Sequence, residues 1–89
     1  MNTGTRIAVV RRAHEVTQTE LGQMCLITQP GLSMIETGAR KATEGQLSDI
    51  RTALGWGPEI DAALDALEWA IMQGGNGTSE AQSGGDTDE

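Results

Sequence analysis

The segment 28–41 carries the side chains of this sequence that are best suited to non-covalent recognition. If the segment forms a helix, Gln29, Ser33 and Thr37 follow one ridge, and Pro30 and Met34 follow the next. None of these side chains is charged. A glutamine carboxamide can pair with N6 and N7 of adenine, and apolar atoms can contact a thymine methyl group. The spacing therefore favours a surface that reads base edges in the DNA major groove, with an ordinary solvated face of a small helical bundle as the alternative.

Two short helices joined by a tight turn must position this surface. Thr17 and Glu20 have the spacing of a capping box that starts a helix, and Thr28 can cap a second helix that Gly38 ends. Apolar residues recur in both helices with helical spacing, which defines an inward face. We expect the buried side chains to be Leu21, Met24, Cys25, Leu32 and Ile35. The uncharged ridge then lies outward, next to the cations of the following loop.

These residues resemble the lambda-repressor and Cro-like helix-turn-helix family, also called the XRE family, over about residues 6–55. Gln18 matches the glutamine that starts the family's second helix, Glu20-Leu21 match its acidic-then-leucine pair, and Ile35-Glu36-Thr37-Gly38 match its ending of hydrophobic residue, Glu, Asn and Gly. The resemblance implies an all-α, compact five-helix lambda-repressor-like domain over residues 1–73. It also implies a sequence-specific DNA-binding transcriptional regulator, a repressor, that binds a palindromic double-stranded DNA operator as a homodimer with helix 28–37 in the major groove.

The resemblance also implies roles for individual side chains. Gln29 would be the principal base reader, and the other residues facing bases would be Thr28, Ser33 and Met34. Phosphate contacts would come from Gln18, Thr37, Arg40 and Lys41. We also expect Arg6 and Arg12 of the first helix to be solvated and close enough to the DNA side to touch phosphate. Arg11 would form an ion pair with Glu36 that joins the first and third helices. Two independent surface charges are the alternative, and an exposed pair contributes only about 0–1 kcal/mol.

Two positions depart from the family pattern. Leu26 stands in the turn where the family usually has glycine, and a β-carbon in the left-handed region costs about 1–2 kcal/mol. Pro30-Gly31 is an unusual opening for a recognition helix, because Gly31 weakens a helix by up to about 1 kcal/mol relative to alanine. We expect close approach to a backbone to compensate at Gly31, and a differently shaped turn at Leu26.

Length, composition and charge limit the function classes. At 89 residues the chain has room for one domain with a small core, and it has no apolar run of the roughly 18–20 residues that span a bilayer. We therefore expect a soluble cytoplasmic protein without a membrane partner. The net charge of −7 is unevenly spread, because residues 1–43 hold five cations against three carboxylates and residues 44–89 hold one cation against ten carboxylates. The predicted reading end is thus modestly positive, which would orient the molecule on DNA.

Three further helices complete the predicted fold. The first is capped by Thr3 or Thr5 and runs to about His14, and the fourth starts at a Thr43–Gln46 capping box. A fifth helix over about 58–73 has an apolar stripe with Trp69 on the far side, which a small core cannot cover. We expect it to form a homodimer through Trp56, Ile60, Leu64, Leu67, Trp69 and Ile71, with packing on its own domain as the alternative. Residues 74–89 are rich in Gly, Ser and acids and are predicted to be disordered.

Two other functions remain open from the sequence. The chain could be an antitoxin whose fifth helix and acidic tail bind a basic toxin while the helix pair represses the shared operon. It could also be a protein-interaction module that has kept the fold and lost DNA binding. We do not expect an enzyme, a cofactor or a metal site, because the sequence has no Cys/His ligand set, phosphate loop or nucleophile–base arrangement, and its single Cys25 fits a buried thiol.

Overall fold

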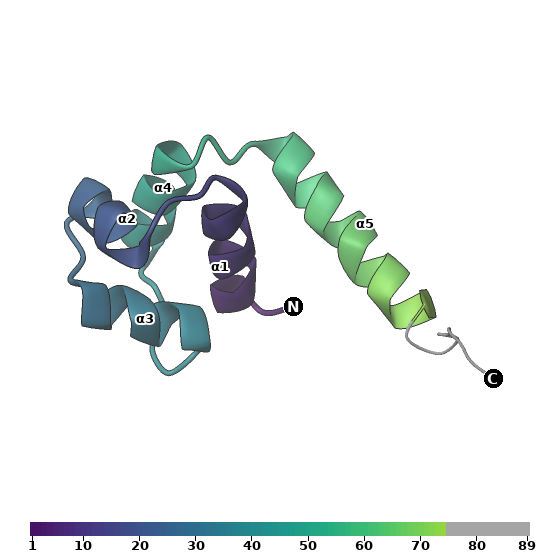
Figure 1. Ribbon diagram of the computed structural model, residues 1–89, viewed down its shortest axis with the longest axis horizontal. Coiled ribbons are helices and arrows are strands. Elements are labelled where there is room, and N and C mark those ends of the chain that lie inside the picture. Colours follow the sequence, from purple (N-terminus) through teal and green to yellow (C-terminus); the bar gives the residue numbers. More distant parts are fainter. Residues whose placement is uncertain (75–89) are drawn as a thin grey trace. The chain divides into compact units, whose positions relative to one another are not determined.

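A computed structural model describes residues 1–74, and these residues form α-helices joined by turns and loops, with no strand among them. The helices are α1 (Thr3–Ala13), α2 (Gln18–Cys25), α3 (Gln29–Thr37), α4 (Glu44–Ala53) and α5 (Pro58–Gly74) (Figure 1). The all-α class is confirmed for this part of the chain. The chain divides into two units, Met1–Gly57 and Pro58–Glu89, which separates α5 from the helices with which we expected it to share a domain. The predicted disordered tail, apart from Gly74, lies outside the described residues.

Local capping sequences determine where the helices begin. In α2 the Thr17 hydroxyl accepts a hydrogen bond from the Glu20 backbone N–H at 3.0 Å, and the Glu20 carboxylate accepts one from the Thr17 N–H at 2.9 Å. The capping box predicted for α4 is also present. The prediction for α1 is wrong, because its cap is Asn2, whose Oδ1 accepts from the Thr5 N–H at 2.8 Å. Asparagine is among the strongest N-cap residues, since its short side chain reaches the free amides of the first turn.

The core of the first unit takes one fully buried side chain from each of its helices. These four residues are Ile7, Leu21, Leu32 and Ile50. Full burial of such a side chain contributes about 1.5–3 kcal/mol to the stability of the fold, so the four helices make similar contributions to the core. The expectation that Met24 is buried is wrong, because its side chain is 53 % exposed. Helix α2 is only 8 residues long, and Leu21 and Cys25 already occupy its inward positions.

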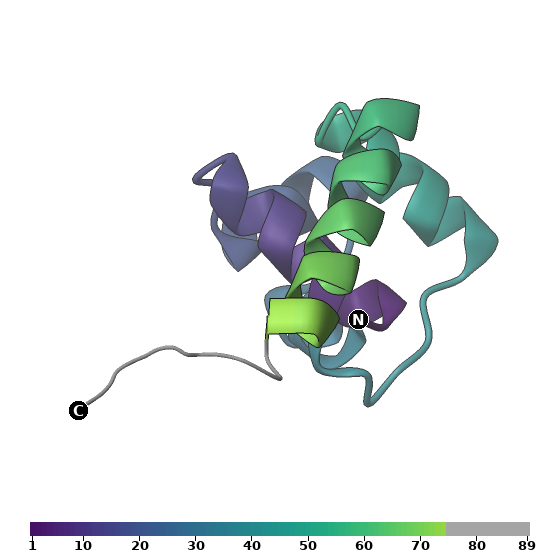
Figure 2. The same cartoon turned by 90° about the vertical axis from the view of Figure 1, so that its right-hand side faces the viewer.

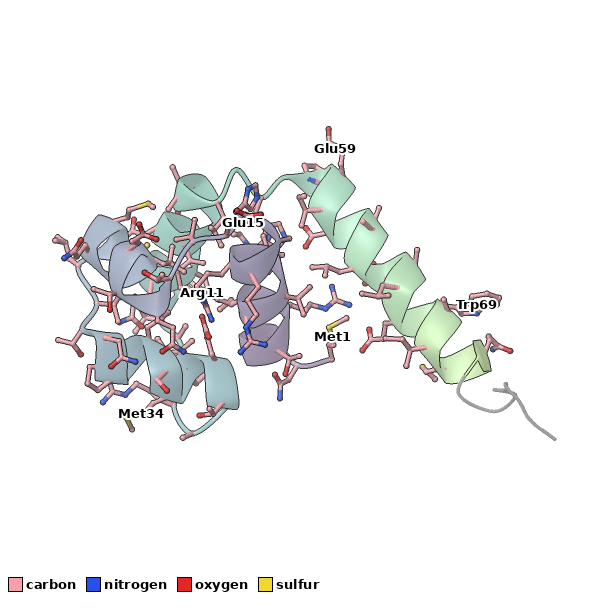
Figure 3. The ribbon with its side chains drawn as sticks, viewed as in Figure 1. Met1, Arg11, Glu15, Met34, Glu59 and Trp69 are labelled. Carbon is pink, nitrogen blue, oxygen red and sulfur yellow. The ribbon has the colours of Figure 1, made fainter. Side chains whose placement is uncertain are left out.

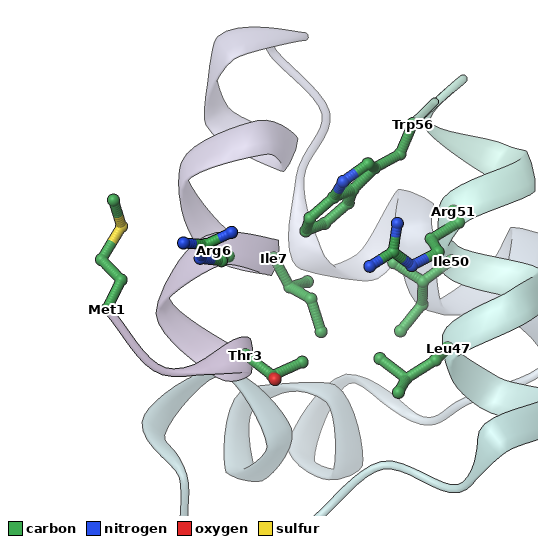
Figure 4. A pocket seen from close by; sticks show the side chains of 8 residues that line it. All are labelled: Met1, Thr3, Arg6, Ile7, Leu47, Ile50, Arg51 and Trp56. Atoms are coloured by element: carbon green, nitrogen blue, oxygen red, sulfur yellow. The ribbon is translucent and has the colours of Figure 1, made fainter. Parts of the chain in front are cut away.

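Trp56 lies in the core of the first unit rather than on an interface. Its side chain is 7 % exposed, and the Arg51 guanidinium lies over its ring at 4.7 Å from the centroid. Together with Ile7 and Ile50 it lines a cavity of about 220 Å³ (Figure 4). The sequence predicted a dimer surface for Trp56, whereas in the folded chain most of this indole is covered.

Helix α5 starts at Pro58, as predicted, and runs to Gly74. Along its apolar stripe, Ile60 is half-buried, Leu64 is buried, and Leu67 and Ile71 are 44 % and 59 % exposed. Trp69 is 65 % exposed. None of the helices in the described part of the chain is long and apolar enough to cross a membrane.

Candidate nucleic-acid interface

Helix α3 divides into an inward and an outward face, with the division predicted from its spacing. Leu32, Ile35 and Glu36 are buried. Met34 is 40 % exposed, and Figure 3 shows its side chain pointing away from the other helices of the first unit. The remaining outward residues are half-buried or exposed, and these are Gln29, Pro30, Ser33 and Thr37. The uncharged ridge, defined by these four residues and Met34, is therefore accessible to a ligand.

The turn between α2 and α3 keeps a left-handed residue although that residue is leucine. Leu26 has φ 58° and ψ 40°, and its side chain is 96 % exposed. The turn thus has the shape that a glycine would give, with the β-carbon strain retained, so the expectation of a different shape is wrong. Close packing fixes the same turn from the other side, because a β-carbon on Gly22 would overlap the carbonyl oxygen of Ile27. The Thr28 hydroxyl then caps α3 by accepting from the Gly31 N–H at 3.1 Å.

A buried ion pair ties α1 to α3 behind the ridge. Arg11 Nε and Nη2 donate to the two carboxylate oxygens of Glu36 at 2.7 Å and 3.0 Å, and Arg11 Nη1 donates to the Val16 carbonyl at 2.8 Å. The two side chains are only 9 % and 4 % exposed. This is the pair that the family resemblance implied, and its bidentate geometry is the strong form of such contacts. Helices α1 and α3 also approach closely at Gly4 of α1, where a β-carbon would overlap the carbonyl oxygen of Ile35 in α3.

Two glutamines extend this pair to the outward face. Gln18 Nε2 donates to Glu36 Oε1 at 2.9 Å, and Gln29 Nε2 donates to Gln18 Oε1 at 2.6 Å. Side chains from α1, α2 and α3 thus form one hydrogen-bonded chain, from Arg11 through Glu36 and Gln18 to Gln29. We call it the Arg11–Gln29 chain. The sequence pattern did not predict the two bonds of Gln18.

The chemistry of the donors and acceptors fixes the direction of this chain. A carboxylate accepts hydrogen bonds and cannot donate, so the amide nitrogen of Gln18 must face Glu36. The carbonyl oxygen of Gln18 then faces Gln29, which must present its own nitrogen there. Gln29 is left with its carbonyl oxygen and one N–H for an external partner. One acceptor beside one donor is the arrangement that matches N6 and N7 of adenine.

The expected phosphate contacts are only partly in place. Arg40 and Lys41 are exposed on the loop between α3 and α4, which Figures 1 and 2 show from two sides. Arg6 lies elsewhere, because it lines the cavity beside Trp56 and Leu47 (Figure 4). That cavity faces α4, so the expectation that Arg6 reaches the DNA side is wrong.

Two further predicted phosphate ligands are occupied by contacts within the protein. The Thr37 hydroxyl donates to the Met34 carbonyl at 3.2 Å, so its proton is directed away from any phosphate oxygen. The Gln18 side chain bonds Glu36 and Gln29, which leaves its backbone N–H in the first turn of α2 for an anion. Arg12 is exposed, as expected, and lines a shallow hollow with Gln18 and Gln29.

No group of three or more His, Cys, Asp or Glu side chains among residues 1–74 is arranged to hold a metal ion. Cys25 is buried, and burial, with a smaller effect of Asp49, raises the pKa of its thiol. The lambda-repressor-like family stays a prediction from the sequence. Comparison of the chain with family models, with curated proteins and with solved structures found no match.

Proposed function

We propose that this protein is a sequence-specific DNA-binding transcriptional regulator of the helix-turn-helix type, with α2 and α3 as the helix pair. Helix α3 would lie in the major groove and present its uncharged ridge to base edges. Occupation of an operator by α3 would block other proteins from the same site. A repressor is therefore the form of regulator that we propose.

The observation that carries this proposal is the Arg11–Gln29 chain. An exposed glutamine normally rotates freely, and its bonds to bulk water favour no particular direction. Here three hydrogen-bonded residues hold Gln29 from behind, and the 2.6 Å bond to Gln18 orients its amide. A solvated surface has no use for such ordering, whereas base recognition requires it, because each correct bidentate pair contributes about 1–3 kcal/mol of discrimination.

Cations around the ridge would supply the contacts that place it. Arg12, beside the two glutamines, and Lys41, on the loop after α3, are exposed and lie on either side of α3 in the chain. Contacts to phosphate fix register and orientation, and base contacts give specificity. The positive balance is small, so we expect weak affinity for non-specific DNA and, because few phosphates are neutralised, a shallow dependence of that affinity on salt.

Selection of bound duplexes from a random pool tests the proposal. The wild-type protein should enrich one motif, and Gln29→Ala should lose about 1–3 kcal/mol, or about 5- to 150-fold in Kd, with relaxed preference at one base pair. Gln23→Ala is the matched control, because Gln23 is an exposed glutamine of α2 outside the hydrogen-bonded chain. If the two variants bind with equal affinity and equal preference, Gln29 does not read bases. If no duplex is bound in a salt-dependent manner, a protein-interaction module becomes the better description.

A homodimer through α5 is part of the proposal. Leu67 and Ile71 continue the apolar stripe with the spacing of a helix pair and are 44 % and 59 % exposed. A two-fold dimer would place two α3 helices in successive major grooves, so the selected motif should be palindromic with half-sites about 34 Å apart. Ile71→Asp should give a monomer in sedimentation equilibrium and a half-site motif in the selection. A wild-type monomer that selects an asymmetric motif would contradict the dimer and leave the role of α3 intact.

An antitoxin is the second candidate, and one observation favours it. Helix α5 has four carboxylates and no lysine or arginine over residues 58–74, and its Trp69 and Met72 are 65 % and 66 % exposed. A basic toxin could cover such a surface. Co-expression with a basic protein encoded next to this chain should then give a stable complex that Trp69→Ala weakens, with DNA binding by α3 unchanged.

A further inference from the structure

The side chain of Arg40 runs back along α3 instead of pointing into the loop. Gly38 adopts φ 86°, which reverses the chain after α3, and the Arg40 N–H then bonds the Met34 carbonyl at 3.1 Å. A β-carbon built on Gly31 would lie 3.5 Å from Arg40 Nη1. The backbone of Arg40 is thus anchored near the end of α3 while its guanidinium reaches the first turn.

The guanidinium lies at the border of the uncharged ridge. Gly31 and Met34 are i and i+3 neighbours on the helix surface, and Met34 is an outward residue. The Thr28 hydroxyl oxygen is 3.0 Å from the same β-carbon position, so Arg40 Nη1 and the cap of α3 approach one point. Arg40 is exposed, and among residues 1–74 its guanidinium has no carboxylate partner. A cation is therefore available where the ridge itself has none.

The chemistry of the ridge shows what this cation adds. Gln29 suits adenine and the Met34 side chain suits a thymine methyl group, but the ridge has no side chain with the two parallel donors that bind O6 and N7 of guanine. A guanidinium has those donors in a planar fork.

We propose that Arg40 reads a guanine in each operator half-site. This inference rests on the proposed function and changes one assignment within it, since the family resemblance implied a phosphate contact for Arg40. The close approach of a backbone that the sequence led us to expect at Gly31 is absent. The neighbours of its missing β-carbon are the side chains of Thr28, Ile27 and Arg40, not a backbone.

Chemical substitution of the operator tests the inference. Each guanine of the selected duplex is replaced in turn by 7-deazaguanine, which removes N7 and leaves base pairing and the phosphates unchanged. At one guanine per half-site the substitution should weaken wild-type binding by about 2- to 12-fold, roughly half of the free energy of a bidentate pair, because O6 keeps its hydrogen bond. The same substitution should have no effect on Arg40→Ala.

Lys41→Ala is the matched control, because Lys41 is the exposed cation next in sequence. It should weaken binding to all duplexes equally and lower the salt slope by about one, as expected for a phosphate contact. If Arg40→Ala behaves like Lys41→Ala and keeps wild-type sensitivity to 7-deazaguanine, Arg40 binds phosphate and the inference is wrong. If an operator is selected and none of its guanines responds, the inference alone fails. If no operator is selected, the proposed function fails as well.

Discussion

Removal of the Arg11 guanidinium should destabilise the first unit more than any surface change. Arg11→Met deletes three hydrogen bonds, two to Glu36 and one to the Val16 carbonyl. The Glu36 carboxylate, whose side chain is 4 % exposed, would then keep only its bond to Gln18. Breaking a buried pair in this way costs about 3–5 kcal/mol, because an uncompensated charge remains inside. The free energy of unfolding of a domain of this size is about 5–10 kcal/mol in total, so the loss should be about a third or more of it.

Urea unfolding of the full chain, followed by circular dichroism, measures this loss. Arg12→Met is the matched control, because Arg12 is exposed and should change stability by no more than about 0.5 kcal/mol. The double variant Arg11→Met, Glu36→Met should recover much of the stability, since apolar side chains of similar volume can replace a buried pair. It should still lose base preference at the position that Gln29 reads, because Gln18 no longer has a carboxylate to orient it. If Arg11→Met unfolds at the same urea concentration as Arg12→Met, the pair does not have the role assigned to it.

Three further outcomes follow from the geometry. Gly4→Ala should lower the free energy of unfolding by about 1–3 kcal/mol, because its β-carbon would overlap the α3 backbone. Gly45→Ala, whose β-carbon has no neighbour closer than 4.0 Å, should raise it by up to about 1 kcal/mol in the same urea assay. Leu26→Gly should raise the free energy of unfolding, measured by thermal unfolding, by about 0.5–1 kcal/mol, because glycine has no strain in the left-handed region. Leu26→Ala keeps the β-carbon and should not raise it. Burial and Asp49 raise the pKa of the Cys25 thiol, so alkylation by iodoacetamide at pH 9 should be slower in the folded chain than in urea. The stability that the protonated thiol contributes should be lost as pH rises above the ordinary thiol pKa of 9.0. Equal alkylation rates in the two states would contradict the burial of Cys25.

Local signals predicted much of the fold. The capping boxes at Thr17 and Thr43 depend on residues three positions apart, so the sequence contains all that they need. The division of α3 into two faces follows in the same way from helical spacing. Trp56 was misplaced because a tryptophan outside a helix pattern can be buried or exposed, and only the packed structure puts Arg51 over its ring.

The finer features of the candidate site could not be predicted from spacing. Gln18 and Gln29 are 11 residues apart, and their bond depends on how α2 and α3 cross and on which rotamers that crossing allows. The position of the Arg40 guanidinium likewise depends on the chain reversal at Gly38. Helical spacing also failed to predict that Met24 is exposed, because it cannot show which of several apolar residues a short helix leaves in solvent.

The bond between Gln18 and Gln29 has a thermodynamic consequence. A glutamine that is already held in one rotamer loses little side-chain entropy when it meets a base, and immobilising a free one costs about 0.5–1.5 kcal/mol. The free protein should therefore show a well-dispersed Gln29 amide pair in its NMR spectrum, with order parameters closer to those of the backbone than to those of Gln23. A mismatched duplex should therefore dissociate faster than the matched operator but associate at the same rate, because the Gln29 amide does not rearrange before contact.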